Sequence, residues 1–343
     1  MYLFGIRQTN ISEDVMETIY LKRKIDDFLL KWKADNDRKP LIVKGCRQIG
    51  KTESIRHFAK VAGYDSFIEI NFVKEEKYKK IIVDGYTASA IIKNISLLDP
   101  SKRFIDGKTL IFFDEITEFP DIATSLKFFK EDGRFDVICS GSMLGVNYKK
   151  IESNSVGYKT DYEMYSLDFE EFLWAKGYKE DVIEDMLLHM KTFTPFNELE
   201  MSVYHGIFLD YVVLGGMPAV VKDYIQKGTF EGSLNTQHQL IADYKEDIRK
   251  YAQGVDQTRI LNVFNSIASQ LAKENKKFQI SKVEDGAIPN NSKNKGKLIE
   301  ICKNIVEKYN IHIADNQIYY FENSRFDNKE KRFIDFYLLA IQV

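Results

Sequence analysis

The sequence predicts an α/β protein: a parallel sheet with flanking helices, followed by a mostly helical domain and a small α+β tail. Three observations lead to this fold class. Four short apolar runs lie in the first 141 residues, as expected for strands buried on both faces of a parallel sheet. Segments with helical periodicity separate these runs. From about residue 178 onward the strand signals fade, and amphipathic helices follow one another.

Length and composition set the frame for this fold. A chain of 343 residues is long enough for about two domains, each with an apolar core. The formal net charge of −2 excludes a global field that would draw the chain onto nucleic acid or an anionic membrane. Three widely spaced cysteines favour free thiols in a reducing compartment. With no signal peptide and no long apolar run, we expect a cytoplasmic protein without a membrane span.

The elements of the first domain follow from periodicity. Residues 19–33 place apolar side chains at helical spacing, which predicts an amphipathic helix. The run "LIVKG" at 41–45 predicts a buried strand, and a helix is expected from Lys51 onward. The helical pattern of 122–132 lies between the last two strands. The remaining strands are predicted at 66–72, 109–115 and 135–141.

The second half of the chain is predicted to be helical. Helices are expected at 180–193, 238–252 and 259–275, and the last of these, followed by a turn, resembles the front half of a helix-turn-helix. A linker rich in Asn, Lys and Ser precedes a predicted helix at 298–309 and two short strands within 311–323. We therefore expect domains at 13–177 and 178–286 and a divergent tail at 287–343.

A phosphate-binding loop is predicted between the first strand and the helix that follows it. Gly45, Gly50, Lys51 and Thr52 fit G-x-x-x-x-G-K-[ST]. In this motif the glycines let backbone N–H groups surround phosphates, the lysine reaches the β- and γ-phosphates, and the hydroxyl binds Mg²⁺. The strand before and the helix after the motif favour this reading over a glycine-bounded surface turn.

An acidic pair ends the strand at 109–115. Asp114 is placed to hold a Mg²⁺ ion next to Thr52, and Glu115 to orient or deprotonate an attacking water. Two carboxylates at the end of an apolar strand are costly unless a cation or a water meets them. The alternative is that Asp114 caps the helical segment that follows.

Small polar residues end the strand at 135–141. Ser140 and Ser142 should emerge at the edge of the sheet where ligands bind in open α/β folds. There a hydroxyl would touch the γ-phosphate or the lytic water, as a sensor. A serine-rich turn without ligand contact is the alternative for each of them.

The chain resembles a known family over about residues 13–286, four fifths of its length. The family is the prokaryotic AAA-superfamily ATPases with a G-x-R-Q-x-G-K-T phosphate loop and a C-terminal domain of unknown function. The segments that carry the resemblance are "KGCRQIGKT", "FIEINF", "FFDEITEFPDIATSLKFFKEDGRFDVICSGSMLG", "VGYKTDYEMYSLDFEEFLWAKG", "LGGMP" and "DIRKYA…SIASQLAKENKKF".

The resemblance implies an ATP-binding core and a helical domain that includes a winged-helix-like module. By position, Gly45, Gly50, Lys51 and Thr52 would bind phosphate and Mg²⁺, and Asp114 and Glu115 would form the acidic pair. Arg47 and Gln48 match the family's R-Q, although their side chains would do no more than brace the loop in the alternative reading. No arginine finger is assigned, and Arg134 and Arg249 are weak candidates. The expected nucleotide-binding residues are Gly45, Arg47, Gln48, Ile49, Gly50, Lys51, Thr52 and Glu53.

The expected function is Mg²⁺-dependent binding of ATP, with slow hydrolysis to ADP and phosphate that drives a conformational change. The adenine pocket is expected between the residues before "LIVKG" and the helical domain. A non-hydrolysing switch, an ATP-controlled DNA-binding regulator and a small-molecule kinase are alternatives. No arginine-rich lid of the kind that kinases need is found. A protein partner of unknown identity is expected, DNA binding is less favoured, and the oligomeric state is left open.

Overall fold

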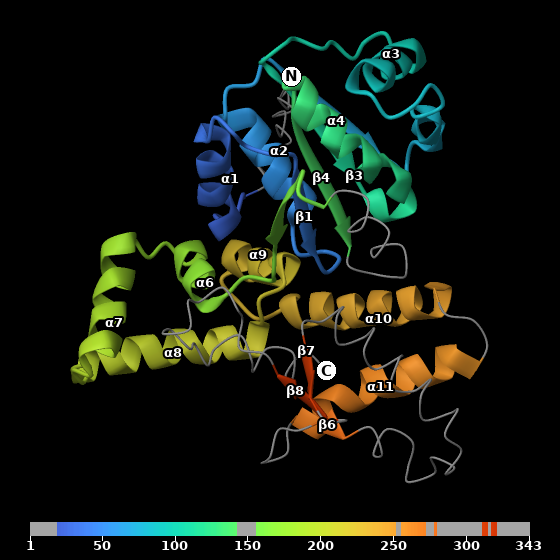
Figure 1. Cartoon of the computed structure of the whole chain (residues 1–343). Helices are drawn as coiled ribbons and strands as arrows, with labels where there is room; N and C mark the ends of the chain where they lie inside the picture. The colour runs from blue at the N-terminus through green and yellow to red at the C-terminus, as the bar shows by residue number, and fades with distance from the viewer. Residues whose placement is uncertain are drawn as a thin grey trace, which may run out of the picture.

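A computed structural model describes residues 19–142, 156–251, 255–271, 278–279, 311–314 and 317–320. Its upper part in Figure 1 is a sheet between helices, and its lower part is helical with a small sheet beside it. Both parts were predicted from the sequence, and the fold class is confirmed.

The main sheet is parallel throughout and has the strand order β2-β3-β4-β1-β5. The four predicted strands are present, with boundaries within two residues of those expected. The fifth strand, β5, was not predicted because "TDYE" is polar and lies at an edge, where only β1 pairs with it. The strands are β1 (Leu41–Gly45), β2 (Ser66–Asn71), β3 (Thr109–Asp114), β4 (Asp136–Ser142) and β5 (Thr160–Glu163).

Helices cover both faces of this sheet, since alternate strand residues point to opposite sides. Leu41 and Val43 pack with the helices α1 and α2, whereas Ile42 packs with α3 and α4 (Figure 1). The helices are α1 (Lys24–Ala34), α2 (Lys51–Val61), α3 (Ala88–Leu98) and α4 (Ser125–Asp132), with the 3₁₀ turns η1 (Glu76–Lys80), η2 (Ile116–Glu118) and η3 (Pro120–Thr124).

The first helix begins later than its periodicity predicts. Arg23 is extended, and its backbone N–H donates to the Asp26 carboxylate at 2.8 Å, so the helix starts at Lys24 rather than at residue 19. The apolar spacing of Leu21 continues the helical pattern, but Leu21 reaches the core from an extended segment.

The helical part shares its core with one face of the sheet. Phe172, Tyr211 and Val220 belong to the same buried cluster as Val43 and Phe58, so the two parts are packed as one body. The three helices predicted in this part are present, and three more lie around them. The helices are α6 (Phe169–Ala175), α7 (Glu180–Thr192), α8 (Glu198–Leu214), α9 (Pro218–Lys227), α10 (Ser233–Tyr251) and α11 (Val255–Leu271).

The small sheet has the order β6-β8-β7 and is antiparallel. β7 (Ile311–Ala314) and β8 (Gln317–Tyr320) are the predicted strand pair, and β6 (Phe278–Gln279) joins them from the end of the predicted helical domain. The predicted helix at 298–309, with Cys302, lies outside the described residues. Cys139 is a buried free thiol in β4. None of the described helices is long and apolar enough to cross a membrane.

Candidate functional site

The predicted phosphate loop connects β1 to α2, as the motif requires. Gly45 has φ 148° and a Cβ there would collide with the Met164 carbonyl oxygen, so only glycine fits. Gly50 has φ 92° and immediately precedes the first turn of α2. The loop therefore directs the N-terminus of an 11-residue helix, with its unpaired N–H groups, toward the carboxyl edge of the sheet.

Lys51 lies folded under this loop. Its side chain is only 7% exposed, and its ammonium donates to the carbonyls of Gly45 at 2.9 Å and Cys46 at 2.5 Å. Burial lowers the pKa of Lys51, although the charges of Cys46, Glu115 and Asp114 oppose that effect. An anion that enters the loop would stabilise this ammonium. Burial has removed water from the positive charge, and the anion compensates for that loss.

Asp114 is the centre of a hydrogen-bond network at the end of β3. Its carboxylate is 4% exposed and accepts hydrogen bonds from Thr52 Oγ1 at 3.2 Å and Asn71 Nδ2 at 2.9 Å. Ser140 Oγ and the backbone N–H of Glu115 bind its other oxygen. All four donors are neutral. The alternative role of Asp114 as a helix cap is therefore not seen, since its oxygens serve three strand ends and the loop helix.

Glu115 follows in a left-handed conformation, with φ 55°, which is uncommon outside glycine and asparagine. Its Oε2 atom is buried without a hydrogen-bond partner in the described structure. Burial, followed by the charge of Asp114, raises the pKa of Glu115, whereas Lys51 and Arg47 act in the opposite direction. A strained, desolvated carboxylate with a vacant acceptor is suited to hold a water and take its proton.

Thr52 and Asp114 are suited to hold a Mg²⁺ ion. A hydroxyl and a carboxylate are hard oxygen donors, and here they are already in contact beside the phosphate loop. The carboxylate has no ion-pair partner in direct contact among the described residues, and its hydrogen-bond donors are all neutral. The donor set therefore fits the metal that accompanies nucleotide phosphates.

The other predicted residues are brought to the same edge, with one exception. Ser142 ends β4 and lies opposite Gly45 in the strand register, and it is buried. Ile49 is buried beneath the loop, and its carbonyl accepts a hydrogen bond from Arg23 at 2.8 Å. Glu53 is exposed in the first turn of α2, and none of the hydrogen bonds or ion pairs of the described residues brings it to the Asp114 network.

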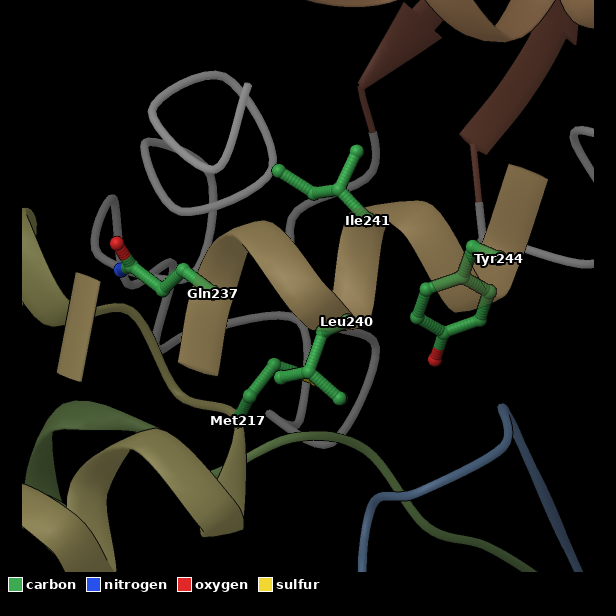
Figure 2. A pocket seen from close by; sticks show the side chains of 5 residues that line it. All are labelled: Met217, Gln237, Leu240, Ile241 and Tyr244. Atoms are coloured by element: carbon green, nitrogen blue, oxygen red, sulfur yellow. The ribbon is translucent and has the colours of Figure 1, made fainter. Parts of the chain in front are cut away.

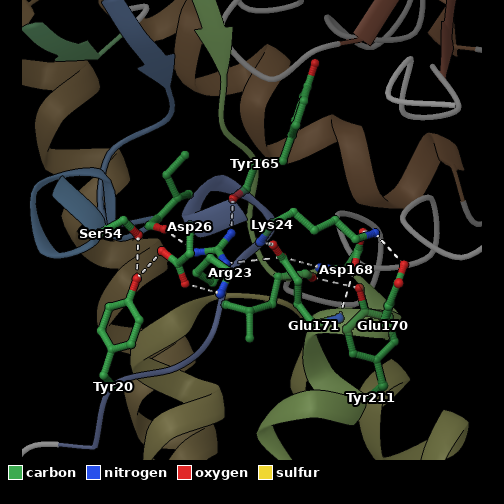
Figure 3. A network of polar contacts seen from close by, with 12 residues as sticks. Tyr20, Arg23, Lys24, Asp26, Ser54, Tyr165, Asp168, Glu170, Glu171 and Tyr211 are labelled. Carbon is green, nitrogen blue, oxygen red and sulfur yellow. Dashed lines mark hydrogen bonds and ion pairs between the residues drawn. The ribbon is translucent and has the colours of Figure 1, made fainter. Parts of the chain in front are cut away.

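A second polar network, which sequence reasoning missed, supports the loop from below (Figure 3). Arg23 is 3% exposed and donates to Ile49 and to the Tyr165 carbonyl at 2.6 Å. Its Nε lies 3.2 Å from the Glu171 carboxylate, where charge rather than an aligned hydrogen bond holds the pair. Glu171 also accepts the backbone N–H groups of Lys24 and Asp168. The signal in the sequence was the box "DFEE", in which Asp168 and Glu171 cap α6 reciprocally.

The helix α10 contacts the phosphate loop from the helical part. Arg47 Nη1 donates to both carboxylate oxygens of Asp247 at 2.8 Å, and Tyr244 donates its hydroxyl to the Arg47 carbonyl at 2.7 Å. Gln48 Nε2 lies 3.4 Å from Asp243 Oδ2. Figure 2 shows Tyr244 at one end of a small pocket, with its hydroxyl pointing away from α10. The pocket is lined by Met217, Gln237, Leu240, Ile241 and Tyr244.

Neither candidate arginine finger contacts this site within the described chain. Arg134 donates to Asp132 within its own turn and to Ser89 at 3.0 Å. Arg249 is exposed near the end of α10. An arginine finger stays unassigned.

A group of possible metal ligands lies elsewhere, where α7 meets α8. Single ligand atoms of Asp185, His189 and Glu200 lie within 4.8 Å of one another. Glu200 already accepts the backbone N–H of Asn197 as the cap of α8, and His189 Nδ1 contacts the Thr194 carbonyl at 3.2 Å. We assign these side chains to the structure of the helix hairpin.

Comparison with known proteins agrees with this geometry. Residues 37–173 match the family model of an AAA domain. This stretch of the chain is thus similar to an AAA domain. The matched range begins before β1 and ends within α6. It contains the phosphate loop and the Asp114 network, and it contains the second network apart from Arg23 and its neighbours on α1. Residues 206–303 match a domain of unknown function, DUF8612. No curated protein matches the chain.

Solved structures with similarity over much of the chain include the ORC1 protein of Aeropyrum pernix in complex with DNA, with TM-score 0.33, 10% identity and coverage of 90% of each chain. Drosophila ORC bound to DNA has TM-score 0.35, 12% identity and coverage of 86% of this chain and 90% of that one. Domain III of Thermotoga maritima DnaA has TM-score 0.34 and 14% identity, with coverage of 61% and 84%. Likeness at this level indicates neither a shared partner nor a shared activity.

Proposed function

We propose that this AAA-like domain binds ATP with Mg²⁺ and hydrolyses it slowly to ADP and phosphate, and that the helical part responds to the nucleotide. The observation that carries the proposal is the arrangement at the carboxyl edge of the sheet. A buried lysine lies under a glycine-bounded loop, and next to it lies a buried aspartate whose hydrogen-bond donors are all neutral. A magnesium-bound triphosphate would supply anionic oxygens to the lysine and a cation to the aspartate.

The residues have distinct roles in this proposal. Lys51 and the N-terminus of α2 bind the phosphates, and Thr52 and Asp114 hold the metal. Mg²⁺ neutralises charge on the phosphate oxygens. Glu115 orients the attacking water and accepts its proton through the buried Oε2. Ser140 fixes Asp114 in place, and it acts on the metal through that carboxylate.

We place the adenine end of the site near Gly50, where groups from both parts of the chain meet. A Cβ at Gly50 would lie 3.6 Å from Arg23 Nη1, 3.8 Å from Pro218 Cγ and 4.0 Å from Met164 Cε. These groups come from the segment before β1, from the first turn of α9 and from the segment after β5. The base would thus be bounded by both parts of the chain, as the sequence led us to expect.

The first test separates specific binding from general charge effects. Lys51→Ala should abolish binding of a fluorescent ATP analogue in a titration with Mg²⁺. Lys60→Ala is the matched control, because it removes an exposed lysine from the same helix. Equal affinity of wild type and Lys51→Ala would refute the proposal.

The second test addresses turnover. Glu115→Gln keeps the shape of the side chain and removes its basic oxygen, so phosphate release should fall by about 10²–10⁴-fold while the ATP analogue still binds. Steady-state phosphate release from wild type, Glu115→Gln and Lys51→Ala measures this. If wild type releases no more phosphate than Lys51→Ala, the protein is a nucleotide-gated switch rather than an ATPase. Phosphate transfer to an added acceptor would instead indicate a kinase.

A further inference from the structure

Three side chains of α10 reach the phosphate loop from one face of that helix. Asp243, Tyr244 and Asp247 lie at positions i, i+1 and i+4, and they contact Gln48, the Arg47 carbonyl and the Arg47 guanidinium respectively. The central contact is an ion pair that is mostly shielded from water, with 26% of the Arg47 and 20% of the Asp247 side chain exposed. Removing one partner of a pair so placed costs more than breaking a fully exposed ion pair.

The guanidinium in this pair belongs to the phosphate loop itself. Arg47 lies between Gly45 and Gly50, four residues before the buried Lys51. A side chain of this loop can turn toward the phosphates that the loop surrounds.

We propose that Arg47 is the residue that distinguishes a triphosphate from a diphosphate in this site, and that Asp247 on α10 competes with the terminal phosphate for it. The inference rests on the proposed function. A carboxylate and a phosphate offer the same kind of anionic oxygen to a guanidinium, so Arg47 exchanges one partner for the other. In the described state the partner is Asp247.

Two consequences follow by linkage. Since the Arg47–Asp247 pair must open when Arg47 turns to the terminal phosphate, the pair weakens triphosphate binding and leaves diphosphate binding unaffected. By reciprocity, a bound triphosphate loosens α10 from the loop. Because α10 packs on α9 and α11, the presence of the terminal phosphate is reported to the helical part of the chain.

Asp247→Asn tests the competition, because the amide keeps the shape of the side chain and removes its charge. We expect the variant to bind a non-hydrolysable ATP analogue with Mg²⁺ at least about five-fold more tightly than wild type does, with ADP affinity changed less than about two-fold. Asp243→Asn is the matched control, since it removes one negative charge from the same helix face without touching Arg47. It should not change the preference for triphosphate over diphosphate.

Arg47→Ala tests the other partner of the ion pair, and its effect on the preference for triphosphate should be opposite to that of Asp247→Asn. This variant should lose most of the wild-type preference for the ATP analogue over ADP. Amide hydrogen exchange in 233–251 of the wild type should be faster with the ATP analogue than with ADP. Equal changes of both affinities in Asp247→Asn, or weaker binding of the ATP analogue, would overturn this inference while leaving nucleotide binding intact. Failure of wild type to bind either nucleotide would instead overturn the proposed function and the inference with it.

Discussion

Two clusters of buried charge support the phosphate loop, one around Arg23 and one around Asp114, and they are built in opposite ways. The Arg23 guanidinium meets the Glu171 carboxylate, so its charge is balanced within the chain. The Asp114 carboxylate meets neutral hydroxyl, amide and backbone donors, and its charge is not balanced by direct contact. The first arrangement holds a helix, a loop and a second helix together. The second keeps a charge ready for a ligand, at a cost to stability that functional sites often carry.

The largest expected effect is a loss of stability when the cluster around Arg23 is disrupted. Arg23→Ala leaves Glu171, which is 1% exposed, without its countercharge, and should lower the free energy of unfolding by about 3–5 kcal/mol. Urea denaturation measures the change. Arg56→Ala is the control, because Arg56 and Glu69 form a more exposed ion pair. Its loss in free energy of unfolding should be about 1 kcal/mol or less. Similar losses in both variants would mean that the Arg23 cluster is no more than a surface pair.

A smaller loss of stability, and a larger loss of ligand binding, are expected for the unbalanced cluster. Asp114→Asn removes the buried charge but also turns one acceptor oxygen into an NH₂ donor that faces existing donors, so the free energy of unfolding of the ligand-free protein should fall by about 1–3 kcal/mol. Wild type should gain about 2.7 kcal/mol from the Mg²⁺-bound ATP analogue at 100 times its dissociation constant, and the variant should gain none. Thermal unfolding with and without ligand measures both quantities. A ligand-induced shift that persists in Asp114→Asn would remove Asp114 from the metal site.

A smaller effect tests the hydrogen bond that Ser140 donates to the buried Asp114 carboxylate. Ser140→Ala deletes a donor to Asp114, and hydrogen bonds to charged groups contribute about 1.5–3 kcal/mol. Ser125→Ala deletes a buried hydroxyl that donates to the Ile122 carbonyl, a neutral acceptor, and should cost about 0.5–1.5 kcal/mol. Urea denaturation compares the two variants. An equal cost in both would contradict the stronger hydrogen bond expected at the Asp114 carboxylate.

The smallest effect is a dependence of nucleotide affinity on pH. Phosphate binding requires protonated Lys51, and burial holds the pKa of this lysine below its ordinary value of 10.5 in the free protein. Affinity should therefore be full at neutral pH and fall as pH rises through that lowered pKa, by at most about ten-fold per pH unit. Fluorescence titrations from pH 7 to 10 measure it. Constant affinity over this range would mean that the pKa of Lys51 is not lowered or that Lys51 does not bind phosphate.

Sequence reasoning located the Asp114 cluster but not the Arg23 cluster, and the reason is physical. Gly45, Lys51, Asp114 and Ser140 each follow or precede an apolar strand, and parallel strands bring their carboxyl ends to one edge, so their meeting could be predicted. Arg23 and Glu171 are 148 positions apart by number, in segments whose local pattern indicates only helix starts. Nothing local in the sequence says that two helix N-termini meet.

The same limit explains the other differences. The polar run Thr160–Glu163 became a strand because β1 offered it an open edge, and that is a property of the assembled sheet. Arg47 and Gln48 were correctly placed in the loop, but their contacts come from α10, about 200 residues later in the chain. The assignment of the domain boundaries, the winged-helix character of the second half and the absence of strong DNA binding stay predictions.

The strand order has a consequence for how the protein is made. β1 is among the first strands to be synthesised, yet both of its neighbours, β4 and β5, are encoded far downstream. At translation rates of about 5–20 residues per second, β1 waits roughly 5 to 25 s for β5 to emerge from the ribosome. Both edges of β1 are unpaired until β4 emerges, and the edge that β5 covers stays open for longer, so the nascent first hundred residues are exposed to edge-to-edge association.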